Sequence, residues 1–584
     1  MRAAAAWTAA TLAAFLVAAL VYLPIAPDVL EAEPDLSCRA TMHDAFARSL
    51  QSGSDIVSTY GPWGLLQRGY DRRTDAVVWL VAALLGAVFA WSVLRITHDA
   101  GGGPAAALLA AVAAGCLVPA GFDARFTVLA LLLVLSALLP PSLQRELPLA
   151  AVLGLVALIK MSLLALAIFA VVMTVLLRRR AIHGVAFLTA FLAAWLAAGQ
   201  RLGGLPRFFL WGLEVVRGYS GASAGGAGVP IAVAGAAGLA IVVIAVERTF
   251  PRIVLLGGAL AYLAKVGFVR GDLTHQTSAA ALLCLFASAY LLLRREAMPR
   301  VRRAVVVAAA MALAIVAAAA LPSFVDRART QWSWMHGRVA RLAAFERDEA
   351  RRSGAAALPA VAGTIDAYPW GSAALIERGL RYTPRPVFQS YMAWTPALAE
   401  LNAAFLRGAR APEWLWSGVG SIDERFPLLD DAPSWLEMMS RYDIAATASD
   451  HLLLHKRAAP RTLETVPAGS VRARLGDDVA VPAAPIVWCS IEARPSAAGV
   501  LRDLFGRPSI MSLEIVTARG ARTRWRVSRA MLGGGFVLSP PIVDADGLSR
   551  LLSGNAGERV TRIRVAGEDI EEPLVVRFAA VTTT

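Results

Sequence analysis

The sequence predicts a polytopic α-helical membrane protein in which about eleven apolar helices precede a folded C-terminal region, residues 323–584. Hydrophobic residues make up 57% of the chain and charged residues only 17%, against about 25% charged residues in a typical soluble domain. Stretches such as 76–97 and 304–321 carry almost no charge and have the roughly 17–25 residues needed to cross a bilayer. This pattern stops after Pro322, so the rest of the chain is predicted to fold in water.

The net charge of +14 comes largely from arginine clusters beside apolar segments, which argues against a nucleic-acid partner. The clusters are Arg178 to Arg180, and Arg294, Arg295, Arg300, Arg302 and Arg303. Short basic loops stay in the cytoplasm. The distribution therefore predicts a bacterial inner-membrane protein with a cytoplasmic N-terminus and a periplasmic or extracellular C-terminal region. The first apolar segment, Ala3 to Pro24, lacks a small-x-small cleavage site and is predicted to remain as a helix.

The predicted spans are, in chain order, 5–26, 76–97, 105–121, 127–140, 148–159, 161–177, 183–199, 229–246, 253–266, 276–293 and 304–321. Residues 148–177 are too many for one straight span and few for two, and Lys160 with Ser162 forms the polar break between them. If the chain reverses at this break, the number of spans is odd. The C-terminal region then lies on the face opposite the N-terminus.

Four loops, 27–75, 122–126, 200–228 and 267–275, then emerge on the same external face as the C-terminal region. The first loop is too long for a simple connection, and residues 39–50 within it have apolar side chains at the spacing of an interfacial helix. An aromatic-rich amphipathic stretch near residues 200–220 is also typical of an interfacial helix. Any functional site is therefore expected at this face.

The C-terminal region is predicted to contain two domains beyond the transmembrane domain, residues 1–322. Residues 323–455 mix helical stretches (332–353, 395–407 and 432–441) with short apolar runs, which is typical of an α/β domain. Residues 456–584 hold short β-type runs (486–492, 512–517, 523–528, 560–565 and 573–579) separated by turn residues. Such spacing predicts a jelly-roll-like β-sandwich.

The first external loop holds the candidate catalytic carboxylates, Glu33, Asp35, Asp44 and Asp55. A partly desolvated carboxylate at the membrane surface can act as a general base or hold a divalent cation, although acidic side chains in an external loop are also commonly just solvated. The same loop reads Tyr60-Gly-Pro-Trp63-Gly. This rigid aromatic turn would suit stacking on a sugar ring, or would serve as a tight turn with an aromatic anchor.

Further candidate binding residues lie in other segments of the same face. Lys265 and Arg270 are placed to receive a phosphate or diphosphate at the bilayer surface, and Asp272 and His275 either contribute or serve as a charge partner and a helix cap. Asp123 would add an acidic group, or pair with its neighbour Arg125. In the C-terminal region, Arg385, Gln389 and Tyr391 form either a polar surface over the membrane cleft or the polar interior of the α/β domain.

The sequence contains no Walker loop, dinucleotide fingerprint, His-Glu-x-x-His or Gly-x-Ser-x-Gly motif, so a cytoplasmic nucleotide donor is not expected. A divalent cation is the one cofactor that the carboxylates leave open. The four cysteines are too scattered for a disulfide framework or a zinc site. Cys38 and Cys489 fall in external segments, where they could pair in an oxidising compartment.

The chain resembles the GT-C class of membrane glycosyltransferases in its many spans, its carboxylates after the first helix and its external C-terminal domain. More narrowly, the motifs Gly53-x-Asp55-Ile-Val-x-Thr-Tyr-Gly-Pro-Trp-Gly64, Gly218-Tyr-Ser220, Lys265-x-Gly-Phe-Val-Arg270-x-Asp-x-x-His275 and Pro384-Arg-Pro-Val-Phe-Gln-Ser-Tyr391 look like those of a group of uncharacterised bacterial membrane proteins distantly similar to that class.

The resemblance implies a catalytic carboxylate at Glu33 or Asp35 and a phosphate-binding residue at Lys265 or Arg270. The proline between Glu33 and Asp35 departs from transferases that have an Asp-Glu pair there. The implied function is transfer of a sugar from a polyprenyl-phosphate donor to a cell-envelope glycan, lipid or protein. The alternatives are a non-enzymatic envelope scaffold or glycan-binding protein and, because no discontinuous helix pairs are evident, less readily a transporter.

Overall fold

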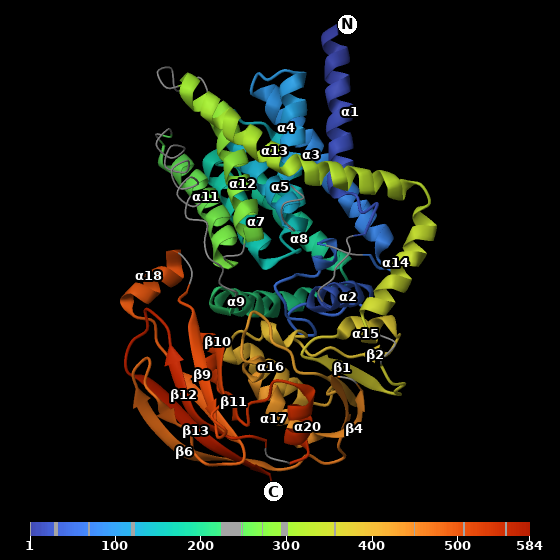
Figure 1. The fold of residues 1–584 in the computed structure, drawn as a ribbon. Helices are drawn as coiled ribbons and strands as arrows, with labels where there is room; N and C mark the ends of the chain where they lie inside the picture. The colour runs from blue at the N-terminus through green and yellow to red at the C-terminus, as the bar shows by residue number, and fades with distance from the viewer. Residues whose placement is uncertain are drawn as a thin grey trace.

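The computed structural model describes residues 2–27, 33–67, 70–117, 123–222, 247, 249–270, 273–293, 302–354, 358–448, 450–505, 508–554 and 557–583. Figure 1 shows a helical region and, below it, a region that contains all the β-sheets, here called the tail. Helices α2 and α9 lie across the junction between the two regions.

The helical region consists of α1 (Arg2–Tyr22), α2 (Glu33–Ala47), η1 (Gly64–Leu66), α3 (Asp75–Asp99), α4 (Pro104–Leu117), α5 (Ala124–Leu138), α6 (Leu143–Val156), α7 (Met161–Arg178), α8 (Ile182–Ala197), η3 (Leu202–Gly204), α9 (Leu205–Ala222), α11 (Phe250–Arg270), α12 (Leu273–Leu293) and α13 (Arg302–Met335). Ten of the predicted spans correspond to helices of this set. The other, 229–246, lies outside the described residues.

The prediction of eleven membrane crossings is wrong for the part of the chain that the structure describes. Four helices there, α1, α3, α7 and α11, are long and apolar enough to cross a membrane, or up to five if the bent pair α8 and α9 forms one span. Helices α4, α5 and α6 have only 14 or 15 residues. At 1.5 Å per residue they are about 21–23 Å long, less than the roughly 30 Å of a hydrocarbon core.

The predicted break at Lys160 is confirmed, because the chain reverses there. Helix α6 ends at Val156, residues 157–160 form a turn, and α7 begins at Met161. The opposite ends of the two helices meet, since Arg178 Nη2 in α7 lies 2.6 Å from Glu146 Oε1 in α6. The two helices are therefore an antiparallel hairpin whose turn carries Lys160.

Further paired charges surround Glu146 at the end of the hairpin opposite this turn. His183 Nε2 lies 2.9 Å from Glu146 Oε2, and Arg145 pairs with Asp99 of α3. Arg145 and Glu146 are each only 1% exposed, and His183 is fully buried. Buried charges are tolerated when they are paired and hydrogen-bonded. The network thus joins α3, α6, α7 and α8 at the ends opposite the Lys160 turn.

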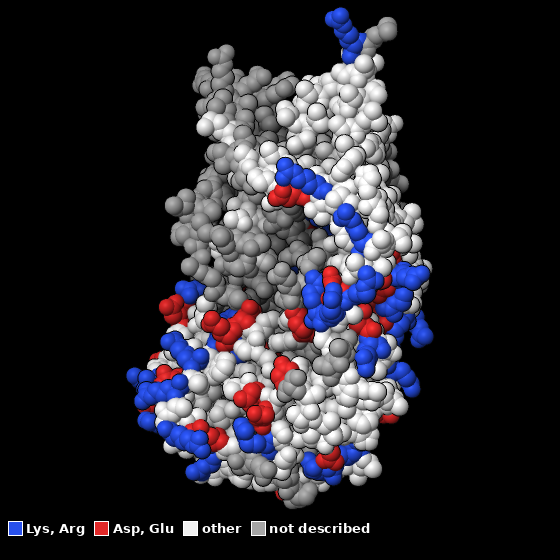
Figure 2. Space-filling model, turned by 45° about the vertical axis from the view of Figure 1, so that its right-hand side comes forward, with Lys and Arg blue, Asp and Glu red and all other residues white. Residues whose placement is uncertain are grey.

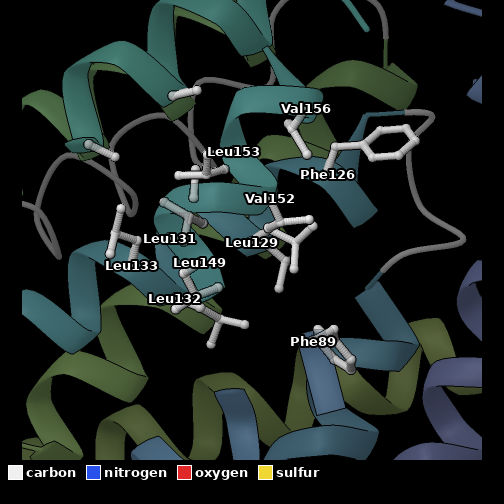
Figure 3. Close-up of a cluster of buried hydrophobic side chains, with 14 of the residues drawn as sticks. Phe89, Phe126, Leu129, Leu131, Leu132, Leu133, Leu149, Val152, Leu153 and Val156 are labelled. Carbon is white, nitrogen blue, oxygen red and sulfur yellow. The ribbon is translucent and has the colours of Figure 1, made fainter. Parts of the chain in front are cut away.

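The apolar core of the helical region includes side chains from α3, α5 and α6 as well as from α1, α4, α7, α8, α11 and α12. Figure 3 shows side chains of this core, including Phe89 from α3, Phe126 and Leu129 from α5, and Leu149 and Leu153 from α6. All five are at most 1% exposed. This packing fixes the N-terminal ends of α5 and α7, which carry Asp123 and Lys160.

The tail begins with α14 (Arg338–Arg352) and a five-stranded sheet in the order β2-β1-β3-β5-β4. Its strands are β1 (Thr364–Tyr368), β2 (Arg381–Tyr382), β3 (Trp414–Ser417), β4 (Tyr442–Ala448) and β5 (His451–Lys456), with α15 (Ser372–Glu377), η6 (Ser390–Met392), α16 (Pro396–Arg407), η7 (Pro427–Leu429) and α17 (Ala432–Arg441) between them. Strands β2, β1 and β3 are parallel, and β5 and β4 are antiparallel additions. The predicted boundary at residue 322 falls inside α13.

The rest of the tail contains two antiparallel four-stranded sheets, β10-β9-β12-β7 and β11-β8-β13-β6. The elements are β6 (Leu463–Ala473), β7 (Val479–Ala480), β8 (Val487–Glu492), α18 (Ala497–Phe505), β9 (Met511–Thr517), β10 (Arg522–Val527), α19 (Arg529–Gly534), β11 (Phe536–Ser539), α20 (Ala545–Leu552), β12 (Val560–Ala566) and β13 (Leu574–Thr583). Five of these strands, β8, β9, β10, β12 and β13, coincide with the predicted runs. Side chains of both sheets share one core.

That core contains Cys489, which is a free thiol, as is Cys38 in α2. The two cysteines that could have paired are therefore separate.

The tail is joined to the helical region by specific contacts. Val57 N donates to Pro386 O at 2.7 Å, and Lys265 Nζ donates to Asp503 O at 3.1 Å. On the face drawn in Figure 2, the blue and red charged side chains gather at this junction and over the tail. The part of the helical region that is not grey is mostly white, so it carries few charged side chains on this face. The expected separation of a lipid-facing region from a water-facing region is thus visible on this face.

Candidate functional site

The turn between α6 and α7 is held by the Tyr60-Gly-Pro-Trp63 segment. Gly61 N donates to Ile159 O at 3.0 Å, Trp63 N donates to Leu158 O at 3.0 Å, and Met161 N donates to Thr59 O at 2.9 Å. A Cβ atom on Gly61 would lie 2.3 Å from the Leu158 oxygen, so only glycine allows this approach. These contacts, here called the clamp, join residues 59–63 to residues 158–161.

The clamp presents Lys160 to a small group of polar side chains, here called the Lys160 cluster: Lys160, Asp123, Gln67 and Tyr60. Lys160 Nζ lies 2.7 Å from Asp123 Oδ2 and 5.5 Å from the centre of the Tyr60 ring. Gln67 donates to the other Asp123 oxygen. Burial disfavours the ionised form of Asp123, but the attraction of Lys160 outweighs it and holds the pKa of this carboxyl below its usual value.

A pocket opens between the Lys160 cluster and two further helices. Its polar lining includes Asp123, Lys160, Tyr262 from α11 and His275 from α12, and its apolar lining comes from residues such as Leu282. The structure therefore brings two predicted binding residues, Asp123 and His275, to one place. Because Lys160 and Asp123 are paired with each other, the pocket combines a closed ion pair and a phenol with apolar walls.

Helix α2 lies beside this cluster and brings the predicted carboxylate Asp35 toward it. The charges of Asp35 and Lys160 both act on the Cys38 thiol and on the Tyr60 phenol. Burial raises the pKa of Cys38 to about 12 and also raises that of Tyr60. Asp35 itself is exposed, so it is the accessible carboxylate of this group.

Glu33, at the start of α2, faces the tail. Its Oε1 accepts a hydrogen bond of 2.7 Å from Ser37, while its Oε2 is buried with no hydrogen-bond partner among the described residues. Burial raises the pKa of Glu33 to about 7, against the smaller effect of Ser37. A carboxyl that titrates near neutral pH and keeps one oxygen unused can accept a proton from a reacting hydroxyl.

Two other predicted binding residues lie close to the start of α2. Gln389 Nε2 donates to Pro34 O at 2.6 Å, and Tyr391 OH donates to Gln389 Oε1 at 3.0 Å. These contacts place the segment of the tail around residue 390 against the residue between Glu33 and Asp35. Gln389 is 1% exposed, so these contacts are part of the packed junction between the tail and α2.

The predicted catalytic carboxylates Asp44 and Asp55 are held in ion pairs and hydrogen bonds that stabilise the first loop. Asp44 is buried and accepts hydrogen bonds from Arg48 at 2.8 Å and Arg73 at 2.9 Å. Asp55 accepts from Gln51 N at 2.9 Å and from Arg410 at 2.5 Å, which ties the loop to the tail.

Trp63 is 4% exposed, and its Nε1 donates to Ala194 O at 2.9 Å. Its ring is thus a buried anchor rather than a surface for stacking on a sugar.

Of the two predicted phosphate-binding residues, Lys265 and Arg270, only Lys265 has a described side chain. Lys265 contacts α18 of the tail through the Asp503 carbonyl. Asp272 and the side chain of Arg270 lie outside the described residues. Arg385 is fully buried, donates to Asp366 Oδ2 at 3.0 Å and lies over the Tyr368 ring at 3.6 Å. Of the two alternatives for Arg385, the polar interior of the α/β domain is the one realised.

From the sequence, Lys160 was predicted only as part of a break between helices, and Gln67 and Tyr262 were not among the predicted site residues. A lysine between two apolar runs was the available signal, because such a residue is costly unless it has a partner. No group of three or more histidine, cysteine or acidic side chains that could hold a metal ion occurs among the described residues. No protein-family model matches the chain, and searches of curated proteins and of solved structures found no match.

Proposed function

We propose that the chain is a membrane glycosyltransferase that moves a sugar from a polyprenyl-phosphate donor to a hydroxyl group of a cell-envelope acceptor. The observation that carries this proposal is the Glu33 carboxylate, with its unpartnered Oε2 and its pKa raised to about 7. A general base works best when its pKa lies near the working pH. The multi-span resemblance described above supplies the substrate class, and Glu33 supplies the base.

In this reaction the acceptor oxygen attacks the anomeric carbon of the donor sugar while its proton passes to Glu33 Oε2, which is buried in the structure and must be uncovered when the acceptor binds. The bond between the anomeric carbon and the donor phosphate oxygen breaks, and the electron pair leaves with the polyprenyl phosphate. Lys160 takes the role that the sequence suggested for Lys265, because it lies in the pocket beside Asp123 and His275. A positive charge there stabilises the phosphate as its charge develops. Asp35, which is exposed, orients the acceptor.

The proposal includes the sidedness expected for such an enzyme in a bacterial inner membrane. The tail and the Lys160 turn lie on the external face, and the N-terminus lies in the cytoplasm. The position of Arg178 supports this arrangement, since it ends α7 at the side opposite the Lys160 turn. Arginines that flank apolar segments favour the cytoplasmic side.

The test is transfer of radiolabelled sugar from a panel of polyprenyl-phosphate donors by membranes with and without the protein. Glu33→Gln is expected to lower transfer by about 100-fold or more, the usual contribution of a general base, because it removes the proton acceptor but keeps the side-chain size. Glu464→Gln, at an exposed position on β6, is the matched control and should leave transfer unchanged. Full activity of Glu33→Gln would exclude Glu33 as the base, even if transfer itself is observed.

A second candidate is a non-enzymatic envelope scaffold. It is favoured by the closed ion pair between Lys160 and Asp123 and by the contact of Lys265 with the tail, since both cations are already engaged. A scaffold predicts no transfer with any donor, together with binding of envelope glycan that Glu33→Gln leaves unchanged.

A further inference from the structure

Helix α9 carries an apolar stripe that is exposed in the part of the chain that the structure describes. Phe209, Leu210, Leu213 and Val216 are 43%, 61%, 56% and 51% exposed. Leu213 follows Phe209 by four residues and Leu210 by three, and Val216 follows Leu213 by three, so the four side chains lie on one side of the helix. A contiguous exposed apolar surface usually marks a contact with a membrane or a partner.

The other sides of α9 are packed between the helical region and the tail. Phe208 and Val215 are 2% and 1% exposed. A Cβ on Gly212 would lie 2.6 Å from the sulfur of Met161, the first residue of α7, and a Cβ on Gly218 would lie 2.4 Å from Trp394 Cβ in the tail. Helix α9 therefore crosses the end of a candidate membrane span, after a bend of 104° from α8. Figure 1 shows α9 at the junction between the helical region and the tail.

A second exposed apolar site lies on α18 of the tail. Val500 and Leu501 are 51% and 59% exposed, and the next turn carries Asp503, whose carbonyl accepts the hydrogen bond from Lys265 near the end of α11. Helix α11 is another candidate span. Helix α18 thus also lies at the end of a span, although it is nearly 300 residues from α9 in the sequence.

We propose that α9 and α18 are in-plane membrane anchors that bury these side chains in the lipid leaflet nearest the tail. The bilayer surface is the one partner that necessarily runs past the ends of both α7 and α11. Arg207 and Arg217, which are exposed near the two ends of the α9 stripe, then lie close to lipid phosphates. Long arginine side chains beside an apolar surface can extend their charged groups to the headgroups. The anchors hold the tail against the membrane whether or not the chain transfers sugar.

The test uses the full-length protein in phospholipid nanodiscs whose acyl chains carry a nitroxide quencher near the headgroup. Leu210→Cys and Leu501→Cys are labelled with an environment-sensitive fluorophore after Cys38 and Cys284 have been replaced by serine; Cys116 and Cys489 are buried. Both labels are expected to be quenched about two-fold or more, as for residues in the headgroup and acyl boundary. Val471→Cys, 41% exposed on β6, is the control and should be quenched by less than about one tenth.

An unquenched label at Leu210 or at Leu501 would overturn the proposal for that helix. A label at Leu210 with blue-shifted but unquenched emission would mean that a second protein surface covers the stripe, and would equally overturn it.

Discussion

Removing Lys160 while keeping Asp123 should destabilise the helical region strongly, because it leaves a largely buried carboxylate without its cation. The two side chains are 21% and 18% exposed, and their charged atoms are 2.7 Å apart. At this distance two unit charges attract by about 6 kcal/mol at an effective dielectric constant of about 20. Desolvation offsets part of that attraction, and loss of one partner of a buried pair costs about 3–5 kcal/mol. We expect the lower value, about 3 kcal/mol, for Lys160→Met since both side chains keep some contact with solvent.

The measurement is a double-mutant cycle of Lys160→Met and Asp123→Asn, with unfolding followed by circular dichroism as SDS is added to mixed micelles. The double variant should recover at least about 2 kcal/mol relative to the sum of the single variants, because neither charge is then left unpaired. Arg494→Met and Glu492→Gln form the matched control. Their charged atoms are also 2.7 Å apart, but the side chains are 72% and 36% exposed, so the coupling should be below about 1 kcal/mol. Additive effects of Lys160→Met and Asp123→Asn would refute the assignment of Lys160 as the partner of Asp123.

Three further predictions follow from the clamp, the tail and Glu33. Gly61→Ala should lower the free energy of unfolding by about 1–3 kcal/mol in the same SDS titration, because the added methyl group overpacks the clamp. Gly203→Ala is the control and should leave the stability unchanged, since its added Cβ meets no atom within 4 Å. Equal unfolding midpoints for the two variants would contradict the clamp. Arg385→Met should cost about 3–5 kcal/mol because it strands the buried Asp366, and a scan of thermal unfolding that shows no loss would contradict this. Burial raises the pKa of Glu33 in the folded protein to about 7, above the usual 4.5 of a glutamate carboxyl. Its contribution to stability is therefore most favourable below pH 4.5 and falls by about 3 kcal/mol as the pH rises to about 7. Glu33→Gln should remove this slope from stability measured against pH, and an unchanged slope would assign it to other groups.

The helices could be predicted from sequence because long apolar runs have few other solutions in lipid. The number of membrane crossings could not, since helices such as α4 and α6 are apolar but short. Apolar character alone does not separate a helix that crosses the bilayer from one that packs inside the protein. Five of the eight strands in the last two sheets could be predicted because turn residues separate runs such as β8 and β9, along which buried and less buried side chains alternate. Strands β6, β7 and β11 were not predicted.

The candidate site was only partly predictable. Glu33 and Asp35 could be selected from the sequence because they follow the first apolar helix. In the structure both lie at the start of α2, at the junction between the helical region and the tail (Figure 1). Lys160 could not be predicted as a site residue in this way. Its place in the site depends on contacts with Tyr60 and Asp123, which are distant in the chain. Arg385 shows the opposite failure. A charged residue within a polar motif suggests a binding surface. In the structure Arg385 is buried instead and forms an internal ion pair with Asp366.

The clamp also constrains how the protein is made. It joins segments separated by about 100 residues in the chain, Tyr60 pairing with Lys160, and contacts between such distant segments form late in folding. During synthesis the Tyr60 segment leaves the ribosome before α6 and α7 exist, so it stays without its partners until that hairpin has entered the membrane. Completion of the hairpin is therefore the biogenesis step at which Lys160 and Asp123 first meet. A chain that stops before residue 160 would insert its first helices yet present an open loop to proteases.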